Sequence, residues 1–106
     1  MKLRLDGKSL RLRLSEADLS QFAATGAVDE TAYFPANNAL KYALKISQSA
    51  TEVTVKFADE QIVVKVPQKL ASEWLESEMV GFDRQIDLEG GRTFKVLVEK
   101  DLGCSH

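Results

Sequence analysis

The residue types that could do chemistry lie closest together at the C-terminal end, where Asp101 is followed by Cys104 and His106. Carboxylate, thiolate and imidazole groups are the ligands that Zn²⁺ takes in proteins, and a thiol beside an imidazole can act as a nucleophile with its base. The Cys-x-His spacing is shorter than a zinc motif requires, and the chain has one cysteine and one histidine. These three residues are therefore weak metal candidates, and a four-ligand site would need the tails of two chains.

Other motifs that mark a reaction or a cofactor are missing. There is no GxGxxG, no P-loop, no HExxH, no GxSxG and no CxxC. A single histidine at the last position also makes a Ser-His-Asp triad very difficult to build. We therefore predict no catalytic residue and no cofactor, and the sequence favours a protein that is not an enzyme.

A basic strip opens the chain, with five lysines and arginines against one acid in the first 14 residues. Because charged residues alternate with leucines there, we expect Arg4, Arg11 and Arg13 on one face of a pair of strands. Such a face could bind a phosphate group or an acidic partner. The alternative is a solvated outer face whose charges protect the edge of a sheet.

The stretch 73–89 has the opposite charge, with six acids and one arginine. Paired carboxylates need a cleft that shifts one pKa before they can do acid–base chemistry, and the sequence indicates no such cleft. The acidic stretch and the basic strip could pair within the monomer or across a dimer. A structural homodimer built on opposite charge therefore remains an alternative.

The segment 33–38 is the least strand-like loop of the chain, and it places two aromatic residues beside turn residues. Loops on rigid scaffolds carry binding residues more often than the elements they connect. With the basic strip, this segment completes the candidate residues for binding a ligand or partner, which are Arg4, Arg11, Arg13, Tyr33, Phe34, Asn37 and Asn38.

The elements that must position these residues follow one pattern written twice, with a gapless offset of 52 positions. Leu5 corresponds to Phe57, and Phe22 corresponds to Trp74, which we expect to anchor a helix on a sheet. A doubled unit implies pseudo-two-fold symmetry, and a shared site would lie on the axis. We expect a single domain, 1–106, made of two pseudo-repeats at about 2–47 and 54–99.

Each repeat is expected to form two strands, a helix and two strands. Alternation of leucine and charge in 2–5 and 9–14 is typical of half-buried strands, and Asp6-Gly7 between them predicts a hairpin turn with positive φ. Ser15 and Asp18 predict the start of a helix that ends at Gly26. The other expected strands are 28–34, 39–47, 52–58, 61–66, 80–88 and 92–99, with a second helix after Pro67.

The predicted fold class is α+β. Internally duplicated ββαββ units would build a mostly antiparallel eight-stranded sheet, a sandwich or a closed barrel, with two helices. Closure into a barrel would remove the exposed edges that small sheets must otherwise protect.

Composition limits the class of partner. The 106 residues carry a formal charge of −2 with a pI of about 5.4, whereas non-specific nucleic-acid binding needs a net basic surface. Charges interrupt the N-terminal leucines, so we expect no signal peptide, and no apolar run reaches the ~18 residues of a membrane span. One cysteine suits a reducing compartment. We therefore expect a cytoplasmic protein that binds neither nucleic acid nor membrane.

Both ends of the chain resemble one family. The runs K-L-R-L-D-G-K-S-L-R-L-R-L over 2–14 and E-K-D-L-G-C over 99–104 resemble small uncharacterised bacterial proteins that open with K-[IL]-R-[IL]-x-G and end with E-K-D-[FL]-x-C. The middle of the chain, around 63–67 and 73–74, is similar to them as well. The resemblance implies a domain of unknown function, so it brings no activity, substrate or catalytic residue, although it gives the 99–104 tail more weight.

The sequence thus predicts a small non-enzymatic binding or interaction module for a protein partner or a small anionic ligand. The first alternative is a small metal-binding or thiol-dependent enzyme that uses Asp101, Cys104 and His106. The second alternative is the structural homodimer.

Overall fold

A computed structural model describes residues 1–101 as eight strands in two four-stranded sheets, with two α-helices. The α+β class with ββαββ halves is confirmed, and the closed barrel is wrong because no strand of one sheet pairs with a strand of the other. The elements are β1 (Lys2–Asp6), β2 (Ser9–Leu14), α1 (Glu16–Thr25), β3 (Ala27–Phe34), β4 (Asn38–Ser47), β5 (Thr54–Ala58), β6 (Gln61–Pro67), α2 (Gln68–Glu76), β7 (Gly81–Asp87), the 3₁₀ helix η1 (Glu89–Gly91) and β8 (Thr93–Lys100).

Each sheet is assembled from both halves of the chain. Sheet A has the strand order β1-β2-β8-β7, and sheet B has the order β3-β4-β6-β5. The outer pairs are antiparallel hairpins, whereas the central pairs β2–β8 and β4–β6 are parallel. A hairpin needs only a tight turn, but parallel neighbours need a longer connection. The parallel pairs are therefore the places where the two halves meet.

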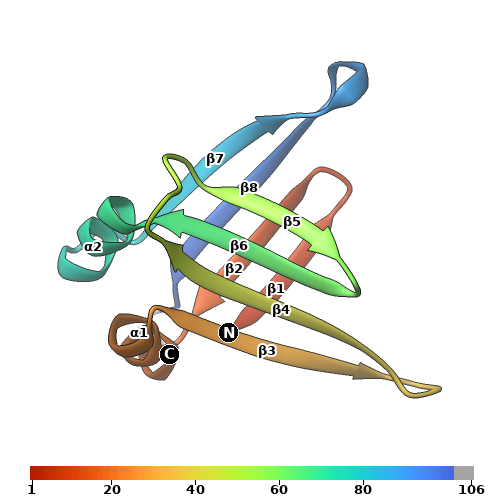
Figure 1. The fold of residues 1–106 in the computed structure, drawn as a ribbon, viewed down its shortest axis with the longest axis horizontal. Coiled ribbons are helices and arrows are strands. Elements are labelled where there is room, and N and C mark those ends of the chain that lie inside the picture. The colour runs from red at the N-terminus through yellow and green to blue at the C-terminus, as the bar shows by residue number, and fades with distance from the viewer. Residues whose placement is uncertain (102–106) are drawn as a thin grey trace.

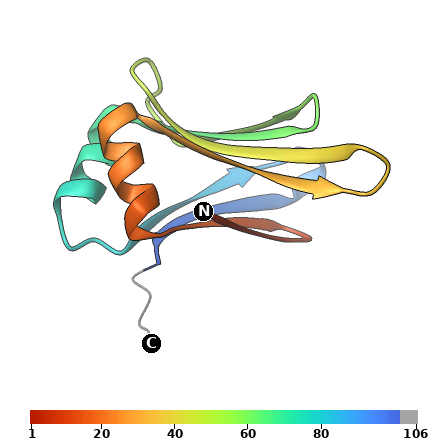
Figure 2. The ribbon, with the colours of Figure 1, turned by 90° about the horizontal axis from the view of Figure 1, so that it is seen from below.

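The two sheets lie face to face, and both helices cover one end of the space between them (Figure 1). The helices lie there because α1 connects β2 of sheet A to β3 of sheet B, and α2 connects β6 of sheet B to β7 of sheet A. The hairpin turns lie at the opposite end, where the sheets spread apart (Figure 2). The sandwich is therefore closed at the helix end and open at the turn end.

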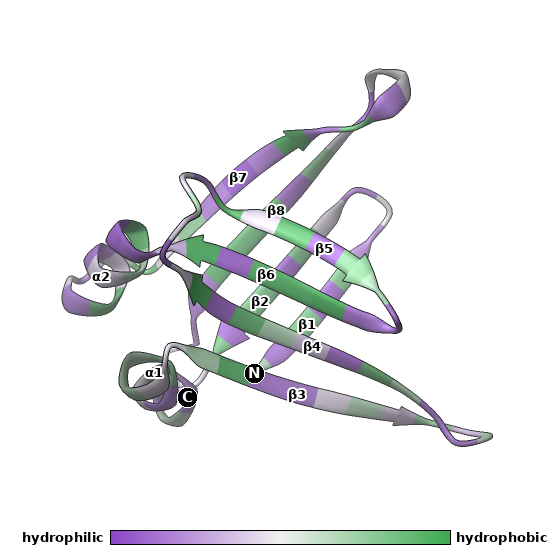
Figure 3. Cartoon of the chain, in the orientation of Figure 1, coloured by the Kyte–Doolittle hydropathy of each residue, from purple (hydrophilic) through white to green (hydrophobic). Residues whose placement is uncertain are grey.

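Alternation along the strands builds the core. Leu10, Leu12 and Leu14 of β2 are buried between the sheets, while the charged residues between them face outward. The same alternation of apolar and polar residues runs along the strands of both sheets (Figure 3). Each sheet therefore has one apolar face and one polar face.

An aromatic cluster joins the helices to this core. Trp74 of α2 is fully buried and makes edge-to-face contacts with two phenylalanines. Its ring centroid lies 6.2 Å from that of Phe22 of α1 and 5.3 Å from that of Phe82 of β7. Its indole Nε1 donates a hydrogen bond to the Val80 carbonyl oxygen at 3.1 Å. Phe22 and Trp74 therefore anchor their helices on the sheets, as predicted, and the indole has its polar partner.

The helix boundaries follow local chemistry. The Ser15 hydroxyl accepts a hydrogen bond from the Asp18 N–H at 3.2 Å, and the Asp18 carboxylate accepts one from the Ser15 N–H at 2.9 Å. Gly26 ends α1 with φ of 80°, so both predicted caps are confirmed. Helix α2 follows Pro67 and has no side-chain cap. Among residues 1–101, neither helix has the length and apolar character needed to cross a membrane.

The strand pairings relate the two halves by two offsets. β1–β2 and β5–β6 have the same register after a shift of 52 positions, whereas β3–β4 and β7–β8 match only after a shift of 54. The connection after α2, residues 77–80, is longer than Gly26 after α1, so the gapless offset is wrong in the second hairpin. The pairs that define these shifts are Lys2–Arg13 with Thr54–Lys65, and Ala27–Lys45 with Gly81–Glu99.

The offset of 54 also matches the backbone of two turns. Ala36 and Asn37 in the β3–β4 turn have φ of 62° and 60°, and Gly90 and Gly91 in the β7–β8 turn have φ of 77° and 76°. Glycine takes positive φ without steric cost, but a side chain on Cβ is crowded there. The backbone of the β3–β4 turn is therefore strained at Ala36 and Asn37, whereas the β7–β8 turn has glycines at the equivalent positions and is relaxed.

The β1–β2 turn forms for a different reason from the one predicted. Gly7 lies outside the left-handed region. The Asp6 carboxylate instead accepts hydrogen bonds from the Lys8 N–H at 2.9 Å and from the Ser9 hydroxyl at 2.8 Å. Both bonds lower the pKa of Asp6, and the bond from the Lys8 N–H has the larger effect. The side chain of Asp6, rather than positive φ at Gly7, stabilises this hairpin.

The strained turn gives a stability prediction with a built-in control. Ala36→Gly is expected to raise the free energy of unfolding by about 0.5–1 kcal/mol, because it removes the Cβ contact at positive φ. Gly90→Ala, at the equivalent position, is expected to lower it by about 1 kcal/mol. Urea denaturation at neutral pH measures both values. A loss of stability in Ala36→Gly would contradict the left-handed conformation of residue 36.

Candidate functional site

The open end of the sandwich contains an apolar cleft with a volume of about 300 Å³. It lies between the two sheets, and strands of both sheets supply its walls. Every side chain that lines it is apolar, so the cleft offers shape and hydrophobic surface but no hydrogen bond. The lining residues are Leu5, Leu10, Leu40, Val55, Phe57, Ile62 and Phe94.

Six of these seven lining residues form three pairs that are equivalent in the two halves. The members of each pair come from opposite sheets, so the two halves of the chain supply matching residues to the two walls of the cleft. The pairs are Leu5 with Phe57 and Leu10 with Ile62 at the offset of 52, and Leu40 with Phe94 at the offset of 54.

The cleft is buried at its floor and exposed at its mouth. Leu10 and Ile62 on the floor are 1% and 6% exposed, whereas their strand neighbours Leu5 and Phe57 at the mouth are 52% and 70% exposed. Full burial of a leucine or phenylalanine side chain contributes about 1.5–3 kcal/mol. A partner that covers the mouth therefore gains free energy from both side chains.

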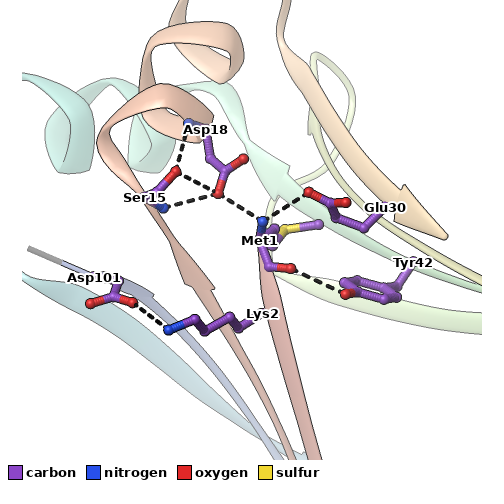
Figure 4. Close-up of polar contacts among 7 residues, drawn as sticks. All are labelled: Met1, Lys2, Ser15, Asp18, Glu30, Tyr42 and Asp101. Atoms are coloured by element: carbon purple, nitrogen blue, oxygen red, sulfur yellow. Dashed lines mark hydrogen bonds and ion pairs between the residues drawn. The ribbon is translucent and has the colours of Figure 1, made fainter. Parts of the chain in front are cut away.

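A polar clasp joins the sheets along one side of the sandwich. The Met1 ammonium lies 2.8 Å from the Asp18 carboxylate of α1 and 3.0 Å from the Glu30 carboxylate of β3 (Figure 4). The Tyr42 hydroxyl of β4 donates a hydrogen bond to the Met1 carbonyl oxygen at 3.1 Å. The start of β1 in sheet A is thereby held against both β3 and β4 in sheet B.

A second clasp with reversed charge joins the other side. Arg84 of β7 donates a hydrogen bond to the Val53 carbonyl oxygen and pairs with the Glu52 carboxylate at 3.1 Å. By strand register, Val53 is the equivalent of Met1, and Arg84 is the equivalent of Glu30. The two clasps therefore hold the sandwich at equivalent positions. In the first clasp β3 supplies the acid, Glu30, whereas in the second clasp the equivalent strand β7 supplies the cation, Arg84.

The first clasp shifts the titration of its members. Burial lowers the pKa of the Met1 ammonium, but hydrogen bonds to Asp18 and Glu30 and their negative charges outweigh it, so the net shift is upward. Burial raises the pKa of Asp18, but its bonds to the ammonium and to Ser15 outweigh it, so the net shift is downward. Burial, followed by the charges of Glu30 and Asp18, raises the pKa of Tyr42. The charged forms of Met1 and Asp18 therefore stabilise the folded state.

The predicted arginines lie on the outer face of sheet A, away from the cleft. Arg4 and Arg11 stand directly opposite each other on β1 and β2. Arg11 Nε lies 2.8 Å from a Glu99 oxygen, and Arg13 lies 3.7 Å from Asp101. Arg4 has no ion-pair partner in the described part of the chain. The structure therefore brings Arg4 and Arg11 together and places an acid beside each of Arg11 and Arg13.

The predicted aromatic loop is partly strand. Tyr33 and Phe34 are the last residues of β3, as the predicted strand 28–34 has them, and Asn38 is the first residue of β4. The predicted loop 33–38 is therefore wrong for these three residues. Asn37 lies in the turn, and the Asn38 side chain donates a hydrogen bond to the Pro35 carbonyl oxygen at 3.3 Å. This hairpin tip lies at the turn end of the sandwich (Figure 2), but its residues do not line the cleft.

Only Asp101 of the C-terminal cluster falls within the described residues, and Cys104 and His106 lie outside them. The Asp101 carboxylate accepts a hydrogen bond from Lys2 Nζ at 3.3 Å, and its N–H donates one to the Leu14 carbonyl oxygen at 2.7 Å. Residues 1–101 contain no group of three histidine, cysteine, aspartate or glutamate residues that could hold a metal ion. In the described residues Asp101 contacts the first two strands of sheet A, through Lys2 and Leu14.

The alternating pattern does not separate the cleft from the core. Leu5 and Phe57 occupy inward positions, as do the fully buried Leu12 and Val64 on the neighbouring strands. The one signal that distinguishes them is position, since each is the last inward residue before a hairpin turn. Position in the strand, rather than residue type, therefore decides whether an apolar side chain lies in the core or at the mouth.

Comparison with known proteins gives a family without an activity. The family described as "Family of unknown function (DUF7009)" matches residues 1–106. No curated protein and no solved structure matches the chain. Function has to be argued from the geometry of the chain itself.

Stability measurements can separate mouth residues from floor residues. Phe57→Ser is expected to lower the free energy of unfolding by less than about 1 kcal/mol, because the side chain is mostly exposed. Ile62→Ala on the floor is expected to lower it by about 2–4 kcal/mol, because it removes buried methyl groups. Urea denaturation distinguishes the two. Equal losses would show that Phe57 is a core residue.

The first clasp predicts a dependence of stability on pH. Because the pKa of Asp18 is lowered in the folded state, its contribution is present above its unfolded value of about 3.9 and is lost as the pH falls through the folded value. Asp18→Asn is expected to lower the free energy of unfolding at neutral pH by about 1–2 kcal/mol and to flatten the acid limb. Denaturation at several pH values measures both effects. Parallel curves for variant and wild type would contradict the assignment.

Proposed function

The chain belongs to this family of unknown function, and we propose that it is a non-enzymatic interaction module whose cleft receives apolar side chains of a partner protein. The observation that carries the proposal is a cleft lined only by apolar side chains that opens to solvent at the turn end. Contiguous apolar surface on a soluble domain is a mark of an interaction site.

The lining favours a protein over a free small molecule. Small-molecule pockets contain a few polar groups that fix the orientation of the ligand, and they usually enclose about 300–1,000 Å³. This cleft lies at the lower limit of that range and has no polar lining residue. Apolar side chains that are held in place by a partner's own backbone need no such polar anchor. The cleft offers no polar or charged group to the small anionic ligand that the sequence also predicted.

The surroundings of the cleft resemble the rim of a protein interface. Protein interfaces combine an apolar centre with a polar, solvent-accessible rim. Here exposed charged residues occupy the adjoining hairpin turns, with Lys8 in the β1–β2 turn and Asp59 and Glu60 in the β5–β6 turn. The exposed Tyr33 and Phe34 add aromatic surface at the same end. These aromatic residues thus keep the binding role expected of them, beside the cleft.

The module is a single domain of two related repeats, 2–47 and 54–99, located in the cytoplasm. Support for the repeats comes from strand registers that match at 52 and 54 and from turns that match in backbone conformation. Support for one unit comes from the cleft, because both halves line it. The single cysteine suits a reducing compartment.

Site-specific photocrosslinking tests the proposal in the cells that produce the protein. Benzoylphenylalanine in place of Phe57 is expected to cross-link a partner protein, because this side chain stands at the mouth of the cleft. Mass spectrometry of the cross-linked peptide should place apolar residues at the attachment point. Adding Leu5→Ser, on the opposite wall, should reduce the yield at least about tenfold, since interface anchors contribute about 2 kcal/mol or more.

The matched control carries benzoylphenylalanine at Lys65, an exposed position on the outer face of β6. It should not label the same partner. Equal labelling from both positions, or a yield that Leu5→Ser leaves unchanged, would overturn the proposal. Cross-links only to a second copy of the chain would replace it with the homodimer.

A further inference from the structure

The outer face of sheet A carries a polar groove on the opposite side of the sheet from the cleft. It consists of a hollow of about 270 Å³ and an adjoining hollow of about 330 Å³ that share Asp6, Ser9 and Lys95. We call the two hollows together the outer groove. Its polar and charged lining residues are Arg4, Asp6, Lys8, Ser9, Arg11, Gln85, Thr93 and Lys95.

The outer groove has an excess of positive charge in a chain whose formal charge is −2. Four cationic side chains line it, against the carboxylate of Asp6 in the lining and the carboxylates of Glu99 and Asp83, which pair with Arg11 at 2.8 Å and with Lys95 at 3.7 Å. Both oxygens of the Asp6 carboxylate already accept hydrogen bonds, one from the Lys8 N–H and one from the Ser9 hydroxyl. Asp6 therefore stabilises the turn and keeps its negative charge, so it offsets one of the four cations.

Two arginines face each other without a shared counter-ion. Arg4 and Arg11 are directly opposite on antiparallel strands, an arrangement in which like charges destabilise a sheet. The next cross-strand pair, Lys2 and Arg13, has the same problem, and there the Asp101 carboxylate lies between them at 3.3 Å and 3.7 Å. An anion bound between Arg4 and Arg11 would offset the repulsion between their charges, as the Asp101 carboxylate does for Lys2 and Arg13.

Arg11 also has an unsatisfied donor. Its Nε lies 2.8 Å from a Glu99 oxygen, which is ion-pair distance, but the N–H does not have hydrogen-bond geometry. This buried nitrogen therefore has no hydrogen-bond partner within residues 1–101. Buried donors without a partner are costly, so Glu99 holds Arg11 by charge without satisfying this donor.

The equivalent surface of sheet B lacks this arrangement, although the strand register is the same. There a hollow of about 190 Å³ is lined by Lys56, Ala58, Asp59, Gln61 and Val63. At the offset of 52, Lys56 replaces Arg4, but Val63 replaces Arg11. The facing arginines are therefore a property of sheet A and not of this type of strand pair.

We propose that the outer groove binds a small phosphorylated molecule, with its phosphoryl group between Arg4 and Arg11 and beside Lys95. The planar guanidinium donors of arginine match the oxygens of a phosphoryl group, and their charge-assisted hydrogen bonds are strong. The Ser9 side chain and the Lys8 ammonium extend the site into the second hollow. This is a second site, independent of the cleft.

Titration of the full chain with sodium pyrophosphate tests the proposal by two-dimensional NMR at constant ionic strength. Saturable shifts are expected at the amides of Ser9, Arg11 and Lys95 and at the side-chain Nε–H groups of Arg4 and Arg11. Arg4→Gln should raise the dissociation constant at least about tenfold, because it removes charge-assisted hydrogen bonds. This exposed substitution leaves the fold intact, and the amide spectrum verifies that directly.

The matched control is Lys56→Gln, which removes the equivalent cation from sheet B and should change the dissociation constant by less than about twofold. Phe57→Ser should also leave it unchanged, so a failure at this site and a failure at the cleft are distinguishable. Shifts that do not saturate, an equal effect of Lys56→Gln, or equally tight binding of sodium acetate would overturn the phosphoryl site.

Discussion

The two parallel pairings, β2 with β8 and β4 with β6, are the contacts on which the rest of the structure depends. Each half of the chain contributes one hairpin to sheet A and the other hairpin to sheet B. A two-stranded hairpin is marginal by itself, so neither half can bury its apolar face alone. The parallel pairs convert four hairpins into two sheets, and the contact between Phe22 and Trp74 then joins the helices of the two halves.

The cleft follows from the same connectivity. Both helices run between the sheets at one end, so that end is covered and the turn end has no element to close it. The clasps at Met1 and Arg84 hold the sheets together along the two sides. What remains open is the mouth between Leu5 and Phe57. The mouth therefore exposes apolar surface to a partner while the core residues of the sandwich stay buried.

Much of the fold could be predicted because local chemistry decides it. The alternation in β2 and the cap formed by Ser15 and Asp18 each specify an element without help from the rest of the chain. The change of offset between the two halves, from 52 in the first hairpin to 54 in the second, could not be predicted from the sequence. Side chains in a strand alternate with a period of two, so a displacement by two residues leaves the inward-facing pattern unchanged. Whether Phe57 lies in the core or at a mouth depends on how far two sheets spread, which is a tertiary property. The sequence placed Arg4 and Arg11 on one face, but only the structure shows that Glu99 pairs with Arg11 alone and that Asp101 lies between Lys2 and Arg13.

The pairing of β2 with β8 also sets the order in which the protein can be made. Leu12 lies opposite Val98, so a strand near the beginning of the chain has its central neighbour near the end. Sheet A cannot be completed until β8 has left the ribosome, and contacts between residues so distant in sequence make folding slow. Until then β2 presents an unpaired edge and a row of leucines to the cell. Sheet B has no such delay, because its four strands lie within residues 27–67, so sheet A is the part of the fold that is completed last.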